Sequence, residues 1–183
     1  MEINQTIKQR RTIHTFSKKR VPNEVILRSI IAANHAPCHR RTFPWRFTSL
    51  GTNKRELLCE LLMSLKFSNE KIDQVNSKKI KEKILNPSHL IVATQTCTDN
   101  QDQKIEDYAA CACAIQNLSL SLVADGVGTK WSTGKITKDP ATYQIAEIDP
   151  KEEEIIGFIL IGYGTVPPMI SRPSLSKVFR ERD

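Results

Sequence analysis

The sequence lacks a long apolar run. Its apolar segments, the longest around "IIGFILIGYG", fall well short of the roughly 20 residues that a membrane-spanning helix needs. The opening residues "MEINQTIKQRR" contain no apolar stretch of the length typical of a signal peptide. We therefore expect a soluble, cytoplasmic protein, neither secreted nor embedded in a membrane.

Cysteines are few and have no metal-binding spacing. The chain contains five, an odd number without a C-x-x-C pair: Cys38, Cys59, Cys97, Cys111 and Cys113. This pattern argues against a disulfide framework and against a zinc site, so we expect free thiols and no metal. Cys111 and Cys113 fall in a helical pattern, where residues two apart point to different sides, and both are predicted to be small packing residues.

Aromatic residues make up only 6% of the chain, although the formal net charge is +7. The charge is spread over the runs "IKQRR", "SKKR", "SKKIKEK" and "FRER", which are largely aliphatic. Surfaces that bind nucleic acid commonly interleave aromatic rings on which bases stack. We therefore do not expect nucleic acid as the partner. Solvated helix faces, or attraction of a phosphorylated small molecule, explain the charge better.

The remaining composition fits one domain over residues 1–183. Apolar periodicity predicts helices over 3–11, 21–36, 53–66, 69–84 and 139–146. It predicts strands at "PWRFTSLG", "HLIVATQTC" and "EEIIGFILIGYG". This order, helices first and then strands mixed with helices, indicates an α+β fold around one sheet.

The segment "DYAACACAIQNLSLSLVADGVG" is apolar almost all the way round a helix. It predicts a buried central helix that ends at Gly126. The following "GTKWSTGKIT" is predicted to be a loop, and the polar tail "SRPSLSKVFRERD" to contain at most a short final helix.

Two segments carry candidate functional residues. In "RRTIHTF", Arg10 and Arg11 end a predicted helix and are followed by Thr12 and His14, a set able to clamp a phosphate. The alternative is a solvated basic helix end. The segment "APCHRRTFPWRF", residues 36–47, is longer, more basic and more aromatic than a simple turn requires.

Four segments in this order resemble the nitroreductase family of flavin enzymes: "RRTIHTF", "AANHAPCHRRTFPWRF", "DYAACACAIQNLSLSLVADGVGTKWSTG" and "GFILIGYGTVPP...SRPSL". The resemblance implies a mixed, largely antiparallel central sheet flanked by helices. It also implies an obligate homodimer with exchanged chain ends and with flavin mononucleotide (FMN) at the subunit interface.

The resemblance assigns three groups of residues to the cofactor. The run of Arg10, Arg11, Thr12 and His14 would hold the phosphate, the ribityl chain and the pyrimidine edge, with Arg172 joining the phosphate. Pro37, Cys38 and His39 would come from the other subunit. The flavin ring would lie along Trp131, Ser132, Thr133 and Gly134, with backbone N–H groups on its edge.

The implied activity is ping-pong transfer of electrons from NAD(P)H, through flavin N5, to a nitroaromatic, a quinone or a similar acceptor. The flavin would carry the chemistry, so no catalytic side chain is expected. Two alternatives remain open. One is a diverged flavoprotein with a specialised redox role, and the other is a flavin-free basic protein that binds nucleic acid.

The chain departs from the usual pattern of this family at several places. Cys38, Arg41 and Phe43 stand where a small polar residue, Asn, and Gln or Glu are common, which alters the substrate pocket. His14 stands where Lys or Arg is usual, and it stabilises an anionic reduced flavin only when protonated. A flavin potential that falls more steeply with pH than in a His14→Lys variant is therefore predicted. Cys38, beside three basic residues, is either a reactive thiol or a packing residue.

Overall fold

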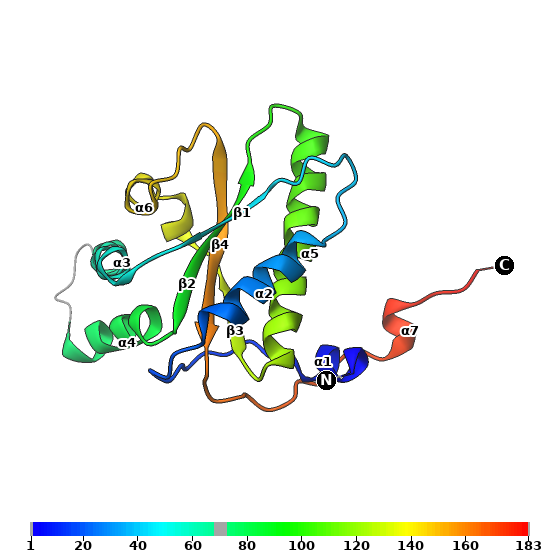
Figure 1. Cartoon of the computed structure of the whole chain (residues 1–183), viewed down its shortest axis with the longest axis horizontal. Helices are drawn as coiled ribbons and strands as arrows, with labels where there is room; N and C mark the ends of the chain where they lie inside the picture. Colours follow the sequence, from blue (N-terminus) through cyan, green and yellow to red (C-terminus); the bar gives the residue numbers. More distant parts are fainter. Residues whose placement is uncertain (1, 68–72, 183) are drawn as a thin grey trace.

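A four-stranded antiparallel sheet lies between two layers of helices (Figure 1). The structure is a computed structural model that describes residues 2–67 and 73–182. The strands are β1 (Trp45–Ser49), β2 (His89–Thr96), β3 (Gly128–Ser132) and β4 (Glu153–Gly162), in the order β1-β2-β4-β3. The α+β class predicted from the sequence is confirmed. A parallel pairing occurs at an isolated bridge between Thr12 and Thr129.

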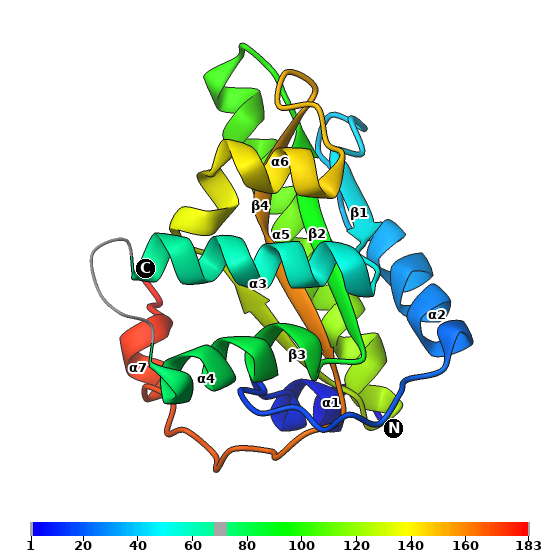
Figure 2. The same ribbon diagram turned by 90° about the vertical axis from the view of Figure 1, so that its left-hand side faces the viewer.

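The helices divide between the two faces of the sheet. One face is covered by α3 (Thr52–Lys66), α4 (Gln74–Leu85) and α6 (Pro140–Ala146), and the other by α2 (Asn23–Asn34) and α5 (Gln101–Ala124) (Figures 1 and 2). The short helix α1 (Ile3–Gln9) lies near the C-terminal end of α5 (Figure 1). A 3₁₀ turn, η1 (Lys135–Lys138), follows β3, and α7 (Leu175–Val178) lies in the C-terminal arm.

Alternation along the central strands separates the core into two clusters. Leu90 and Val92 of β2 pack under α3 and α4, whereas Ile91 and Ala93 pack against α2 and α5. Strand side chains alternate between the two faces of a sheet, so the continuous apolar run of β2 supplies both clusters. The prediction of a strand buried on both faces is confirmed.

Two boundaries differ from the sequence-based expectation. The central helix α5 begins at Gln101, six residues before the predicted Asp107, because the Asn100 side chain accepts a hydrogen bond from the Gln103 N–H and caps it. The helix predicted over 69–84 is described from Gln74 onward, and residues 69–72 of that prediction lie outside the described residues.

The prediction of a loop at "GTKWSTGKIT" is wrong for its first half. Residues Gly128–Ser132 form β3, which pairs antiparallel with β4. A segment with one glycine, one lysine and no apolar alternation has little intrinsic strand signal. Its pairing is set by the neighbouring β4 and by the bridge to Thr12, neither of which is local in sequence.

The helix α5 is not buried on all sides of this chain. Cys111, Leu118 and Leu122 face the core, but Ile105 is 70% exposed and Tyr108 is 45% exposed. The same outward stripe contains further exposed residues, namely Ala109, Cys113 and Gln116. The packing role predicted for Cys111 is confirmed, whereas the one predicted for Cys113 is wrong in the single chain.

After β4 the chain forms an arm that leaves the body of the molecule (Figure 1). The arm is exposed along most of its length and carries large apolar side chains at Val166, Met169, Ile170, Leu175 and Phe179. Within residues 2–67 and 73–182, no helix combines the length and the apolarity needed to cross a bilayer.

Candidate functional site

The basic N-terminal run lies against the edge strand β3. The helix α1 ends at Gln9, and the chain then runs extended past Thr129, whose carbonyl accepts a hydrogen bond of 2.9 Å from the Ile13 N–H. The Ile13 side chain is 3% exposed and belongs to the core. Because side chains alternate along an extended chain, Thr12 and His14 are placed on the side opposite Ile13.

The structure gives Arg11 a different environment from its neighbours in the run. Its Nη1 lies 2.6 Å from the Lys8 carbonyl oxygen and 2.8 Å from that of Arg10. Carbonyl groups in the last turn of a helix lack partners within the helix, and a basic side chain there satisfies them. Arg11 therefore caps α1, on the side of the run that carries Ile13.

The end of β3 presents a fixed aromatic ring. Trp131 Nε1 donates to the Ile156 carbonyl at 3.2 Å, and its ring lies 6.3 Å from that of Tyr108. Gly157 is required beneath it, because a Cβ there would lie 2.1 Å from Trp131 Nε1 and the backbone has a φ of +158°. Beyond the ring, Ser132 is half-buried, and Thr133 and Gly134 are exposed.

Sequence reasoning missed the cationic neighbours of His14. Lys130 Nζ lies 3.2 Å from His14 Nδ1, a hydrogen bond that requires an unprotonated Nδ1. Burial lowers the pKa of Lys83, and the nearby charges of Lys130 and Lys66 lower it further. One cation, Lys130, thus lies beside His14, where the sequence suggested only an imidazole. Had Gly128–Ser132 been predicted as a strand, Lys130 could have been placed beside the run that contains His14.

The loop between α2 and β1 is tied to the start of α5. Thr42 Oγ1 lies 2.5 Å from Asp107 Oδ1, and Arg40 Nε lies 2.6 Å from Glu106 Oε2. Arg41 and Phe43 have φ values of 54° and 44°, a region that costs a bulky residue about 1 to 3 kcal/mol. The contacts to α5 hold the loop in this strained shape.

Two of the three predicted groups of cofactor residues lie far apart in one chain. Pro37, Cys38 and His39 lie in the loop near the N-terminal end of α5, whereas Arg10–His14 lie near its C-terminal end (Figure 1). At 1.5 Å per residue, the stretch of α5 from Asp107 to its last residue is about 25 Å long. Arg172 lies exposed in the C-terminal arm.

Cys38 is half-buried and has hydrogen-bond donors near its sulfur. Burial raises the pKa of the Cys38 thiol, but hydrogen bonds to Thr42 and Phe43 more than offset it, so the net shift is downward. The Phe43 N–H, 3.4 Å from Sγ, is the firmer donor, since the single Thr42 hydroxyl proton also faces Asp107.

We expect Cys38 to be alkylated faster than Cys97 near pH 8 in the FMN-free protein. Burial and nearby carboxylates raise the pKa of Cys97, so less of its thiolate is present at that pH. Burial also raises the pKa of Cys59 to about 11 and that of Cys111 to about 12, so both should react last. Mass spectrometry of iodoacetamide-treated protein measures the order. Equal rates at Cys38 and Cys97 would contradict the lowered pKa.

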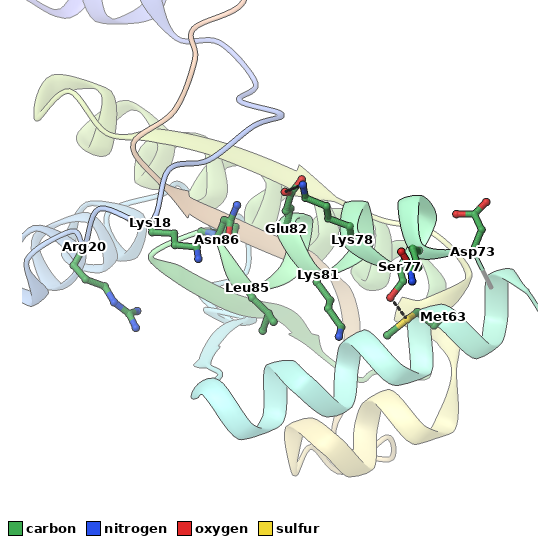
Figure 3. Close-up of a pocket in the computed structure, with 12 residues that line it drawn as sticks. Lys18, Arg20, Met63, Asp73, Ser77, Lys78, Lys81, Glu82, Leu85 and Asn86 are labelled. Carbon is green, nitrogen blue, oxygen red and sulfur yellow. Dashed lines mark hydrogen bonds and ion pairs between the residues drawn. The ribbon is translucent and has the colours of Figure 1, made fainter.

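A cavity of about 900 Å³ lies beside α4, away from these groups (Figure 3). Lys81 and Leu85 point from α4 toward α3, and Ser77 donates to Met63 Sδ across the gap. Its walls also carry Lys18, Arg20 and Lys78, balanced in part by Asp73 and Glu82. None of the predicted cofactor residues lines it.

Comparisons with known proteins agree on one family. The protein-family model described as "Nitroreductase family" matches residues 7–163 of this sequence. The chain is 31% identical over 169 residues to a Bacillus subtilis protein named "Putative NAD(P)H nitroreductase YfhC", covering 91% of this chain and 86% of that protein.

Solved structures share the fold. A nitroreductase-like family protein from Bacillus cereus has a TM-score of 0.84 at 24% identity, over 100% of this chain and 97% of that one. A nitroreductase with bound FMN from Bacteroides fragilis has a TM-score of 0.75 at 20% identity, over 100% of both chains.

Proposed function

Because the chain belongs to the nitroreductase family, we propose that it binds FMN and passes electrons from NAD(P)H to a nitroaromatic, a quinone or a similar acceptor. The observation that carries this proposal is the pairing of the basic run with β3. The bridge from Thr12 to Thr129 brings phosphate-binding chemistry next to the segment that begins at Trp131.

The residues present fit an FMN molecule laid along β3. Arg10 and the Thr12 hydroxyl can donate to a phosphate, and Lys130 adds positive charge farther along. β3 is an edge strand, so alternate backbone N–H groups face away from β4 and can bind the edge of a ring. The bound flavin supplies the hydride chemistry. The chain would position the FMN, place positive charge near it and pack the held Trp131 ring beside it.

We further propose that two chains build each site. Exposed apolar residues on α2 and α5, including Leu27, Ile31 and Ile105, offer a surface for a second copy, as does the apolar arm. The loop with Pro37–His39 would then reach the flavin held by the Arg10 run of the partner. This arrangement accounts for the separation of the two groups along α5.

Replacing Ile105 by lysine should weaken the dimer, because it places a charge in the proposed apolar interface. We expect a shift toward monomer in light scattering, together with loss of bound FMN. The matched control is Val75→Lys, which changes an exposed residue of α4 on the opposite side of the sheet. Retention of both dimer and FMN by Ile105→Lys would exclude this interface.

Replacing Arg10 by alanine should raise the FMN dissociation constant about 10- to 100-fold, the loss expected for a charge-assisted hydrogen bond to phosphate. Fluorescence titration of the FMN-free protein measures it. Lys18→Ala, which removes an exposed cation elsewhere, should leave the constant unchanged. If both substitutions raise the FMN dissociation constant equally, the net positive charge of the protein, and not a direct contact from Arg10, attracts FMN.

An absorbance spectrum before and after anaerobic addition of NADPH tests the function directly. Flavin bands that bleach and then return with a quinone support the proposal. Bleaching without return would favour a specialised flavoprotein, for which the altered Arg41 and Phe43 provide a reason. A colourless protein that takes up no FMN would contradict the proposal.

A further inference from the structure

The cavity beside α4 has a cationic end, formed by Lys18, Arg20 and Lys81. The first two side chains belong to the segment that precedes α2, and the third belongs to α4. In Figure 3, Leu85 lies between Arg20 and Lys81, and Pro87 also lines the cavity. Cations from two separate segments thus surround a partly apolar floor, away from the residues proposed to bind FMN.

The two carboxylates that line the cavity are engaged with other groups. Asp73 caps α4, because its side chain accepts hydrogen bonds of 2.6 and 2.9 Å from the backbone and side chain of Asn76. Glu82 pairs with Lys78 on the same helix. Among the residues that the structure describes, none of the three cations at the cationic end forms an ion pair. This end of the cavity therefore keeps uncompensated positive charge.

A buried guanidinium adds to the positive charge behind the cationic end. Arg55 is 4% exposed, and its Nη1 lies 3.5 Å from the Ser88 carbonyl oxygen. Arg20 Nη1 donates to the same oxygen at 3.0 Å. Two guanidinium groups thus share one neutral acceptor. Their positive potentials add, so an anion placed beside Arg20 would be attracted by both.

We propose that the cationic end binds a small polyphosphate anion, either inorganic or the phosphate chain of a nucleotide. Phosphate oxygens accept charge-assisted hydrogen bonds from guanidinium and ammonium groups. A phosphate chain places several negative charges within a short distance, which suits three cations around one groove. Leu85 and Pro87 would contact the nucleoside part of a nucleotide, and the volume of about 900 Å³ is large enough to admit one.

Calorimetry with inorganic triphosphate, ATP and orthophosphate tests the site. The protein is first saturated with FMN, so that the flavin site is filled. Triphosphate should bind at least about tenfold more tightly than orthophosphate, because it brings more charge to the same cations. Its affinity should fall as NaCl is added, since the cations are exposed to solvent. Equal affinities of triphosphate and ATP would identify the phosphate chain as the ligand, and tighter binding of ATP would include the nucleoside.

Charge substitutions locate the contacts. Arg20→Gln and Lys81→Gln should each weaken triphosphate binding about fivefold, the loss expected for one exposed charge contact. Glu82→Gln should strengthen it, because the change removes a negative charge from the cavity and releases Lys78. The matched control is Lys79→Gln, which changes the net charge equally at an exposed position of α4 outside the cavity lining.

His89 provides a local readout of binding. Its Nδ1 lies 3.1 Å from Ser88 Oγ, and its Nε2 faces Asn23 Oδ1 at 3.4 Å. Burial lowers the pKa of His89, and the charges of Arg20 and Arg55 lower it further. A polyphosphate beside Arg20 would offset those charges and favour the protonated ring. The His89 pKa measured by NMR should therefore rise when triphosphate is added, and an unchanged value would place the anion elsewhere.

Several results would overturn the inference. No binding of triphosphate at millimolar concentration would do so, as would equal losses of affinity in Lys81→Gln and Lys79→Gln. Binding of RNA or of an acidic peptide without binding of triphosphate would mean that the surface recognises a macromolecule instead. None of these measurements depends on bleaching of a flavin by NADPH, so this inference and the proposed redox function can fail separately.

Discussion

Replacing Gly164 by alanine is expected to destabilise the protein by about 3 kcal/mol or more and to abolish FMN binding. A Cβ at this position would lie 2.1 Å from the Thr15 carbonyl oxygen and 2.7 Å from Ile13 Cγ2. The first of these atoms belongs to the backbone and cannot rotate away. The bridge between Phe16 and Gly164 must therefore open, which would release the chain that follows the Arg10 run.

Urea denaturation and FMN titration measure the two parts of this result. Gly51→Ala is the matched control, because a Cβ there would have no atom within 4 Å. Its φ of −71° is also open to alanine. If the two variants unfold at the same urea concentration, the close contact between Gly164 and the Thr15 backbone does not stabilise the protein.

Replacing Arg55 by methionine is expected to destabilise the protein by about 3 to 5 kcal/mol. Arg55 is 4% exposed, and its guanidinium donates to the carbonyl groups of Ile84, Pro87 and Ser88 at the end of α4. Burial lowers the pKa of Arg55, and the charge of Arg20 lowers it further. Methionine fills similar space but leaves these carbonyl groups buried without donors.

The neighbouring Lys54→Gln provides the control for Arg55. Lys54 pairs with the exposed Glu147 at 2.8 Å, and surface pairs contribute about 1 kcal/mol or less. Arg55→Lys keeps a charge but loses the planar fork, so its stability should fall between those of the native protein and Arg55→Met. If Arg55→Met lowers the free energy of unfolding by less than about 1 kcal/mol, water must take over the hydrogen bonds that the guanidinium donates to these carbonyl groups.

The elements that the sequence predicted are those whose pattern is local. Ile26 and Ala33 recur at helical spacing in α2 and are buried, and Leu90 to Ala93 form a continuous apolar strand. By contrast, β3 depends on β4 and on the N-terminal run for its partners. The first turn of α5 is polar, so only its Asn100 cap marks where the helix begins.

The residue types of the candidate site could be predicted from the sequence, but the directions of their side chains could not. A basic run followed by a hydroxyl indicated phosphate chemistry, yet the sequence could not show that Arg11 caps α1 or that Lys130 reaches His14. Such features depend on contacts between residues far apart along the chain.

If two chains build each site as proposed, the stretch of α5 between the Pro37–His39 loop and the Arg10 run makes FMN binding depend on protein concentration. A lone chain would then offer only part of the contacts of the proposed site, so it should hold FMN more weakly. Dilution of the protein would then release cofactor even when free FMN is unchanged. Conversely, FMN would favour association of the chains, because each equilibrium shifts the other by the same factor.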